Sequence, residues 1–373
     1  MYINIYTKKI IISYAFLGWL SFALYYVSWL ESVLNMWWAL VLYSVILFLI
    51  YALWKFLHGR EQAHFFLFFI SFLYRVSVLL AITILIIWTF VVYHNELRPA
   101  QFPLYTLSNW ERTLKFQTVS HIASSSFYLQ IRDSIKQAKD QDFVLLFEGV
   151  RPWSEANMEA FNRALWINFS DTLYENFSRL YGVTSQDNMM FLWLWETADI
   201  NVDLDIDTIM DLYREKKWEA YNPESTGDIL QVDDEIIRVL ADIQARELAV
   251  LQYFNQALLN FFMKQSRLQW FILERTSMDI FSVILWERDQ YIAEFISESE
   301  YEKMFALYGK LHFEGILREL KLRDMRWEIV DVEYKQVIER ASYETEERYR
   351  QLQSTNSQRR ETILRHIQMS DWH

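Results

Sequence analysis

Three long runs of apolar residues occupy the first quarter of the chain and constrain its fold more than any other feature. Residues 10–30 and 32–54 contain no charged side chain, and a third run over residues 73–93 contains only Arg75. An α-helix rises about 1.5 Å per residue, so about 20 apolar residues cross the hydrocarbon core of a bilayer, which is about 30 Å thick. The sequence therefore predicts a three-helix transmembrane region over residues 1–93, embedded in the lipid bilayer.

The basic residues that flank these runs all lie in connections that would be on the same side of the membrane. Lys8 and Lys9 precede the first run, and Lys55 and Arg60 lie between the second and the third, whereas the connection between the first two has only Glu31. The positive-inside rule places basic flanks in the cytoplasm. Three spans then carry the chain outward. We expect an integral protein of the cell inner membrane whose larger domain is extracytoplasmic, in the periplasm.

The rest of the chain is strongly acidic and contains no cysteine. The 373-residue chain has 36 basic and 48 acidic residues, of which five and two lie in residues 1–93, leaving 31 and 46 beyond them. Such a domain repels phosphate backbones, because nucleic-acid affinity comes mainly from basic side chains. The absence of cysteine excludes disulfides and thiolate chemistry. We therefore expect no nucleic-acid partner.

Short apolar runs alternate with helical patterns after a polar stretch, residues 94–112, that we expect to be a linker. Residues 114–119 and 143–147 have the length and composition of strands, and residues 124–139 between them have helical spacing and serine N-caps. Strand, helix and strand in this order are typical of a βαβ unit. A similar order of strand, helix and strand recurs over residues 303–332.

These patterns predict the fold class of the region that follows the membrane helices. Residues 113–334 are expected to form an α/β (α+β) domain with a central mixed sheet and many helices. Residues 335–373 are mostly charged and rich in glutamine, and we expect a solvated C-terminal tail. The acidic run 199–207 lacks the glycine of a calcium loop, and Arg214 stands where the loop's last glutamate should be, so helix capping by Asp205 or Asp207 is favoured.

Two histidines and a glutamate lie at equivalent corners of this pattern. His121 and His312 each follow an apolar run and precede a helix, and Glu148 directly follows the apolar run 143–147. Open α/β sheets place their ligand sites at the carboxyl ends of strands. A buried carboxylate there needs a metal, an arginine or an imidazolium as its partner. A divalent metal site is one interpretation, and two structural histidines bonded to nearby backbone are the other.

Four segments in order resemble motifs of the TraB/PrgY/GumN/TIKI family. In the first two, residues 118–123 and 143–150, one strand ends near a histidine and the next ends in glutamate. The third, residues 286–296, begins Trp-Glu-Arg-Asp and is similar to a helix of the family, and the fourth, residues 308–317, contains Gly-Lys-Leu-His. The chain departs from the family at Thr118, which stands in place of a glycine.

The resemblance implies a metal site formed by His121, Glu148 and His312, holding Mn, Co or Zn, with Glu148 and Arg288 in catalytic roles. It implies a membrane-anchored, metal-dependent hydrolase, a peptidase acting on extracytoplasmic peptides or protein segments. If the family glycine supplies a positive φ, Thr118 would disturb the first corner of the site. Two alternatives are a non-catalytic binding or signalling module of the same fold, and a ligand-binding or esterase relative.

Overall fold

The computed structural model describes part of the 373-residue chain, which divides into two compact units. One unit comprises Met1–Tyr93 with Leu240–Phe254, and the other comprises His94–Val239 with Asn255–His373. The described residues are 63–149, 154–165, 168, 172–186, 199–216, 231–265, 278–339 and 344–352.

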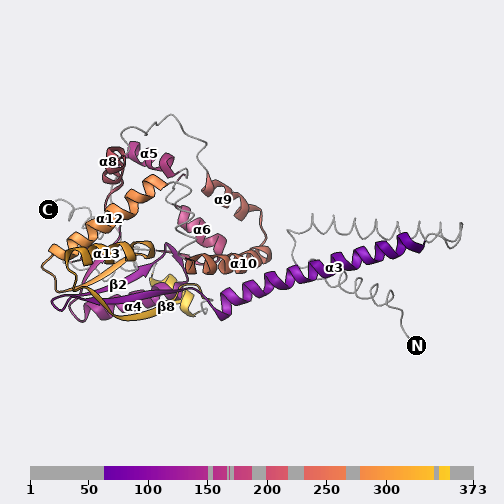
Figure 1. Ribbon diagram of the computed structural model, residues 1–373, viewed down its shortest axis with the longest axis horizontal. Helices are drawn as coiled ribbons and strands as arrows, with labels where there is room; N and C mark the ends of the chain where they lie inside the picture. Colours follow the sequence, from indigo (N-terminus) through magenta and orange to yellow (C-terminus); the bar gives the residue numbers. More distant parts are fainter. Residues whose placement is uncertain are drawn as a thin grey trace. The chain divides into compact units, whose positions relative to one another are not determined.

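The larger unit is built on a six-stranded mixed sheet (Figure 1). Its strand order is β6-β4-β7-β2-β1-β8. The first four of these strands run parallel to one another. Strand β1 is antiparallel to both of its neighbours, β2 and β8, so β8 runs in the same direction as the first four strands. The bounds are β1 Gln101–Ser108, β2 Thr113–Val119, β4 Val144–Phe147, β6 Ile200–Asn201, β7 Lys303–Gly309 and β8 Glu328–Gln336.

Helices and a second, two-stranded sheet make up the other regular elements of the described residues. The small sheet pairs β3 Ile122–Ala123 with β5 Thr184–Ser185. The helices are α3 Ala63–Val92, η3 Tyr93–Leu97, α4 Ser125–Lys139, α5 Glu155–Leu165, α6 Leu173–Tyr181, α8 Ile206–Lys216, α9 Val232–Asp242, α10 Ala245–Lys264, α12 Met278–Glu298, η4 Lys310–His312 and α13 Phe313–Arg323.

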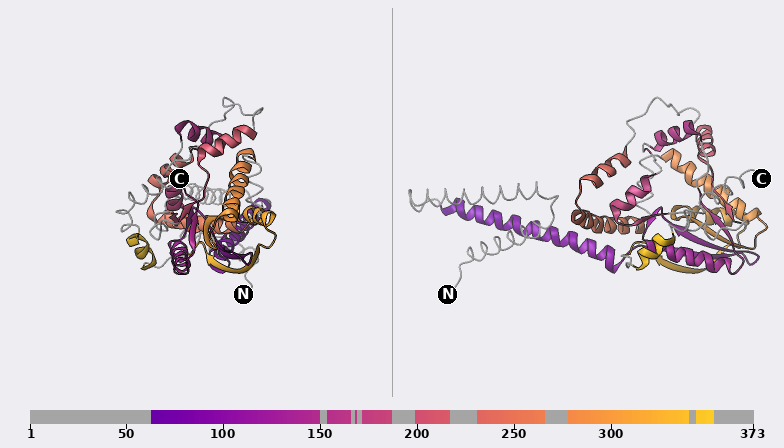
Figure 2. Two further views of the ribbon diagram at one scale, coloured as in Figure 1. Left: turned by 90° about the vertical axis from the view of Figure 1, so that its left-hand side faces the viewer. Right: turned by 180° about the vertical axis from the view of Figure 1, so that it is seen from behind.

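Alternating side chains of the buried strands divide the core between the two faces of the sheet. On β7, Phe305 and Leu307 join the apolar cluster that contains α4, whereas Met304, Ala306 and Tyr308 join the cluster that contains α12 and α13. Side chains alternate across a strand, so a run that is apolar throughout must be covered on both faces. Helix α4 accordingly covers one face, and α12 with α13 covers the other (Figures 1 and 2).

Helix α3 does not supply the expected third membrane span. Arg75 divides it, and the charge-free remainder, residues 76–92, has 17 residues and covers about 25 Å of a hydrocarbon core about 30 Å thick. No helix among the described residues is both long enough and apolar enough to cross a membrane. The expected spans 10–30 and 32–54 lie outside the described residues. The finding contradicts the predicted transmembrane region, and with it the predicted inner-membrane location and periplasmic domain.

Two stretches expected to flank the domain contribute to its core. Residues 94–112 were expected to be a linker, but they contain β1, which lies between β2 and β8 in the sheet. The tail expected over residues 335–373 begins inside β8. Val337, Ile338 and Tyr349, which belong to that tail, are buried in the cluster beneath α4. The described part of the tail therefore packs on the domain, against expectation.

Replacing Tyr349 with alanine is expected to lower the free energy of unfolding by about 3 kcal/mol. Its ring is 3% exposed, lies 6.4 Å from the ring of Tyr128, and would leave a cavity in the core. Urea unfolding followed by circular dichroism measures the change. The matched control is Arg350→Ala, whose side chain is 65% exposed and whose loss should change stability by less than about 0.5 kcal/mol. Equal effects of the two substitutions would contradict the packing of this segment.

Candidate functional site

The carboxyl ends of four adjacent parallel strands bring the charged residues of the site together. In the sheet register, Val119 at the end of β2 is aligned with Gly309 at the end of β7. Phe147 at the end of β4 is aligned with Leu307 of β7 and with Asn201 of β6. The residues that follow these ends therefore share one edge of the sheet. They are His121 after β2, Glu148 after β4, Asp203 after β6 and His312 after β7.

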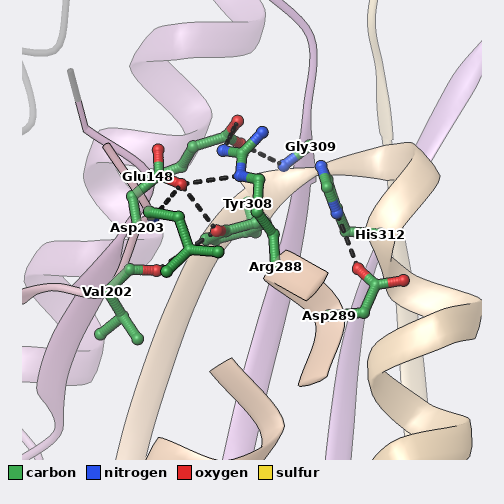
Figure 3. A network of polar contacts seen from close by, with 9 residues as sticks. Glu148, Val202, Asp203, Arg288, Asp289, Tyr308, Gly309 and His312 are labelled. Carbon is green, nitrogen blue, oxygen red and sulfur yellow. Dashed lines mark hydrogen bonds and ion pairs between the residues drawn. The ribbon is translucent and has the colours of Figure 1, made fainter. Parts of the chain in front are cut away.

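Arg288 of α12 lies between two of these carboxylates (Figure 3). Its Nη2 donates to Glu148 Oε1 at 2.6 Å, and its Nε donates to Asp203 Oδ1 at 2.7 Å. The three side chains are between 10% and 16% exposed. A buried carboxylate is stable only with a partner, so one guanidinium serves both acids here. Arg288 is thereby fixed in place by two strand ends.

Glu148 is held as an anion by its surroundings. Its second oxygen, Oε2, accepts a hydrogen bond from the backbone N–H of Gly309 at 2.9 Å. Burial alone would raise the pKa of Glu148, but Arg288, His312 and His121 together lower it to about 2. Burial also raises the pKa of Asp203, against the opposing effect of Arg288. Glu148 therefore stays charged throughout the neutral range.

His312 forms a second polar pair with Asp289, the residue next to Arg288 on α12. Its Nδ1 lies 2.7 Å from Asp289 Oδ1, and both side chains are buried, at 6% and 7% exposed. No hydrogen bond of its other ring nitrogen, Nε2, is found among the described residues. A carboxylate on Nδ1 fixes the ring orientation and favours the tautomer that carries its proton on Nδ1. His312 thus presents an oriented nitrogen with a free lone pair.

Gly315 on α13 makes room for this pair. A Cβ atom at Gly315 would lie 1.7 Å from Asp289 Oδ2, which is far inside van der Waals contact. The side chain of Asp289 therefore lies directly against the backbone of the helix that begins just after His312. Gly309 differs from Gly315 in this respect, because a Cβ at Gly309 would be in ordinary van der Waals contact, 3.4 Å from Glu148 Oε2 and from His312 Cδ2.

Tyr308 contacts both the Glu148–Arg288–Asp203 cluster and the His312–Asp289 pair. Its hydroxyl can donate a hydrogen bond to either of two acceptors, Val202 O at 3.2 Å or Asp203 Oδ1 at 3.3 Å. Its ring lies edge-on to the ring of His312, with centroids 5.0 Å apart, and the Arg288 guanidinium lies 5.5 Å from its centroid. Burial raises the pKa of Tyr308, so its hydroxyl remains a donor. The three-residue cluster and the His312–Asp289 pair therefore both contact the fully buried ring of Tyr308 (Figure 3).

His121 lies near enough to Glu148, Arg288 and His312 to interact with their charges, and it belongs to a small group of elements formed by β3, β5 and α6. Its carbonyl accepts from the backbone N–H of Gln186 at 2.7 Å, and its ring packs on Tyr174 with centroids 4.4 Å apart. The His121 side chain is exposed, yet the surrounding protein still desolvates it and lowers its pKa; Glu148 acts in the opposite direction. The exposed surface gives access to ligands, and the lowered pKa favours a neutral imidazole at neutral pH.

Thr118 causes no strain at this corner. It lies inside β2, its hydroxyl donates to Pro103 O at 2.8 Å, and it is not among the residues with positive φ. A threonine fits an extended strand well, because its branched Cβ suits the pleated surface. The concern that Thr118 replaces a glycine of positive φ is therefore removed.

The predicted divalent metal site is contradicted within the described residues. The structure brings His121, Glu148 and His312 to one sheet edge, but it arranges no described group of three or more His, Asp or Glu residues to hold a metal ion. The donor set gives the physical reason. Both oxygens of Glu148 already accept hydrogen bonds, one of them from Arg288, whose fixed positive charge opposes a cation. The residues present do not fit Mn, Co or Zn.

Several side chains of the site escaped the sequence analysis. They are Asp203, Asp289, Tyr308 and Tyr174. Asp203 lies in the acidic run interpreted as a helix cap, and Asp205 of that run does cap α8 by accepting from Thr208 N at 2.6 Å. The available signal for Asp289 was its position beside Arg288 in the third motif.

No protein family, curated protein or solved structure compared with this chain matches it. Inferences about its function therefore rest on the geometry of the site.

Proposed function

We propose that the protein is a hydrolase that cleaves an ester or amide bond, peptides included, with His312 as the general base. One observation carries the proposal. The His312 ring is buried, and its Nδ1 lies 2.7 Å from Asp289 Oδ1. It follows β7 at the carboxyl ends of the parallel strands, as Glu148 follows β4. A histidine oriented by a carboxylate is the arrangement that activates water or a hydroxyl nucleophile in many hydrolases.

His312 suits the base role better than Glu148 does. A carboxylate with a pKa of about 2 has little affinity for a proton near neutral pH, so it is a weak base there. Its two oxygens are also engaged by Arg288 and Gly309. The imidazole is the side chain best suited to proton transfer in the neutral range. In this proposal Glu148 and Arg288 have a structural role, because their ion pair joins the ends of the strands to α12.

The proposed reaction proceeds by direct attack of water. His312 Nε2 removes a proton from the water as its oxygen bonds to the substrate carbonyl carbon, while the proton on Nδ1 stays with His312 and faces Asp289. The neutral His121 imidazole donates its N–H to the carbonyl oxygen, where negative charge develops. As the tetrahedral intermediate collapses, the proton on His312 Nε2 passes to the leaving alcohol or amine. The water's oxygen remains in the product acid.

A distant relationship to the TraB/PrgY/GumN/TIKI family is part of the same proposal. Its support is that the four resembling segments, far apart in sequence, supply His121, Glu148, Arg288 and His312 to a single sheet edge. The assignment covers the domain and its site residues, and the chemistry proposed for them uses no metal.

Hydrolysis assays on purified full-length chain test the proposed function. With chromogenic esters and a peptide library, His312→Gln and Asp289→Asn are each expected to lower kcat by at least about 100-fold, because each removes one half of the general base. Chelator should leave the wild-type rate unchanged.

Circular dichroism spectra and urea unfolding midpoints establish whether His312→Gln and Asp289→Asn fold like the wild type. The surface control is Arg238→Gln, whose side chain is 66% exposed on α9 and which should keep the wild-type rate. If the wild type is no faster than the His312→Gln variant on any substrate, the hydrolase proposal fails. The fold would then be better described as a binding module.

A further inference from the structure

The site has a buried charged layer and an exposed aromatic pair. Arg288, Asp203 and Asp289 are nearly inaccessible, with side chains between 7% and 11% exposed. Tyr174, in contrast, is 38% exposed and packs on the exposed His121 ring. A ligand approaching this edge of the sheet therefore meets the rings before it meets the charges. His121 belongs both to this exposed pair and to the proposed reacting groups, whereas Tyr174 contributes contact surface alone.

Tyr174 is held in place by more than its contact with His121. It lies in the first turn of α6, whose start is tied to α9 through Asp233. The carboxylate of Asp233 accepts from Thr172 Oγ1 at 2.8 Å and from Asn176 Nδ2 at 2.7 Å. Both donors lie within two residues of Tyr174. A ring on so well anchored a helix start loses little freedom when a ligand covers it, which favours binding.

The surroundings of Tyr174 keep its phenol group protonated. Burial raises its pKa to about 12, with a further contribution from Glu148 and an opposing one from Arg288. The ring is consequently neutral, and it retains both an apolar face and a hydroxyl donor. Aromatic rings prefer offset or edge contacts with other rings, worth about 0.5–1.5 kcal/mol beyond the area buried. Tyr174 is suited to a planar partner and offers no charge to an ionic one.

We infer that Tyr174 is a specificity-determining residue that selects substrates with an aromatic ring next to the scissile bond, contacted by the exposed surface of the Tyr174–His121 pair. The expected effect of Tyr174 on KM rests on the proposed hydrolase function. The binding of an aromatic ring to the Tyr174–His121 pair does not depend on it. The substrate class is an aryl or arylalkyl ester or amide, including a peptide with an aromatic side chain at the cleaved bond.

A pair of matched esters tests the kinetic form. Phenyl acetate and cyclohexyl acetate present rings of similar size, and only the first is planar and aromatic. The wild type is expected to show the lower KM for the phenyl ester. Tyr174→Ala should raise that KM about 2- to 12-fold, the equivalent of 0.5–1.5 kcal/mol, and should raise the KM for the cyclohexyl ester less. Tyr174→Phe retains the ring and should retain the preference for the phenyl ester.

Ring binding is measured separately by titrating the full chain with phenol and following the imidazole resonances of His121 by NMR. Saturable shifts that weaken in Tyr174→Ala and persist in Tyr174→Phe support the inference, even if no ester is cleaved and the hydrolase proposal fails. Hydrolysis with equal KM changes for both esters, and no saturable shift, would overturn the inference and leave the hydrolase proposal standing. A chain that neither cleaves esters nor binds phenol would overturn both.

Discussion

Replacement of Arg288 by methionine is expected to lower the free energy of unfolding by about 3–5 kcal/mol. The substitution keeps a long side chain but leaves Glu148 and Asp203 buried without a cation, and an unpaired buried charge costs about that much. Urea unfolding near neutral pH measures the loss. Substituting Glu148 with glutamine in the same variant should recover part of it, because one of the two unpaired charges is then gone.

The pH dependence of the two proteins provides a second measurement. In the wild type the pKa of Glu148 is lowered from 4.5 to about 2, so its stabilising contribution is complete above about pH 4.5 and is lost as pH falls toward 2. In Arg288→Met, burial without a cation raises both carboxyl pKa values above those of the unfolded chain. Protonation at low pH then favours the folded variant, and its stability falls as pH rises. The difference between the two proteins should therefore be smallest near pH 2, where the carboxyl groups of both are protonated, and should grow as pH rises.

A surface ion pair is the control for the Arg288 prediction. Arg238 and Glu235 on α9 are paired at 2.9 Å with both side chains about two-thirds exposed, so Arg238→Met should change stability by less than about 1 kcal/mol. If Arg288→Met proved no more destabilising than Arg238→Met, the buried three-residue cluster would not exist in solution.

Local sequence patterns predicted the elements of the parallel part of the sheet well. Residues 114–119, 143–147 and 303–308 were expected to be strands and correspond to β2, β4 and β7. The expected helix 124–139 is α4, with Ser124 at its N-cap accepting from Phe127 N. These segments are apolar throughout or amphipathic with a clear period, because they are buried on one or both faces. Strong burial leaves a pattern that can be read without tertiary information.

The margins of the domain were predicted poorly, for an equally physical reason. Strand β1 contains Pro103, which cannot donate to a ladder, so the segment resembled a linker. The strand expected at the end of residues 303–332 is present as β8, but the segment after it is buried only at scattered positions such as Val337 and Tyr349. Few buried residues among many charged ones leave no periodic signal. Long-range packing decides the structure of such segments.

The candidate site was predicted in part. Strand ends placed His121, Glu148 and His312 at one edge, and the third motif supplied Arg288, but the charge balance was misjudged. The predicted partner of Glu148 was a metal, with arginine and imidazolium as the alternatives, and the structure shows that it is Arg288. Asp289 could not be assigned to His312 from sequence, because the pairing depends on how closely α12 approaches α13.

Replacement of Gly315 by alanine is expected to break the His312–Asp289 pair and to lower hydrolytic activity by at least about 100-fold, as Asp289→Asn does. Helix propensity alone would make alanine more stable than glycine by about 1 kcal/mol. The new Cβ would lie 1.7 Å from Asp289 Oδ2, 2.6 Å from its Cγ and 3.3 Å from its Cβ. Such overlap forces Asp289 or α13 to move and costs about 1–3 kcal/mol or more, so destabilisation should prevail.

A double-mutant cycle separates this overlap from any general effect of alanine in α13. In an Asp289→Ala background the overlapping Oδ2 and Cγ atoms are gone, and only the contact at 3.3 Å remains. Gly315→Ala should then be neutral or stabilising, reflecting the higher helix propensity of alanine. The imidazole resonances of His312 should move toward those of Asp289→Asn in the Gly315→Ala single variant. If Gly315→Ala destabilises equally in both backgrounds, or leaves the His312 resonances unchanged, Gly315 does not set the approach that orients the proposed base.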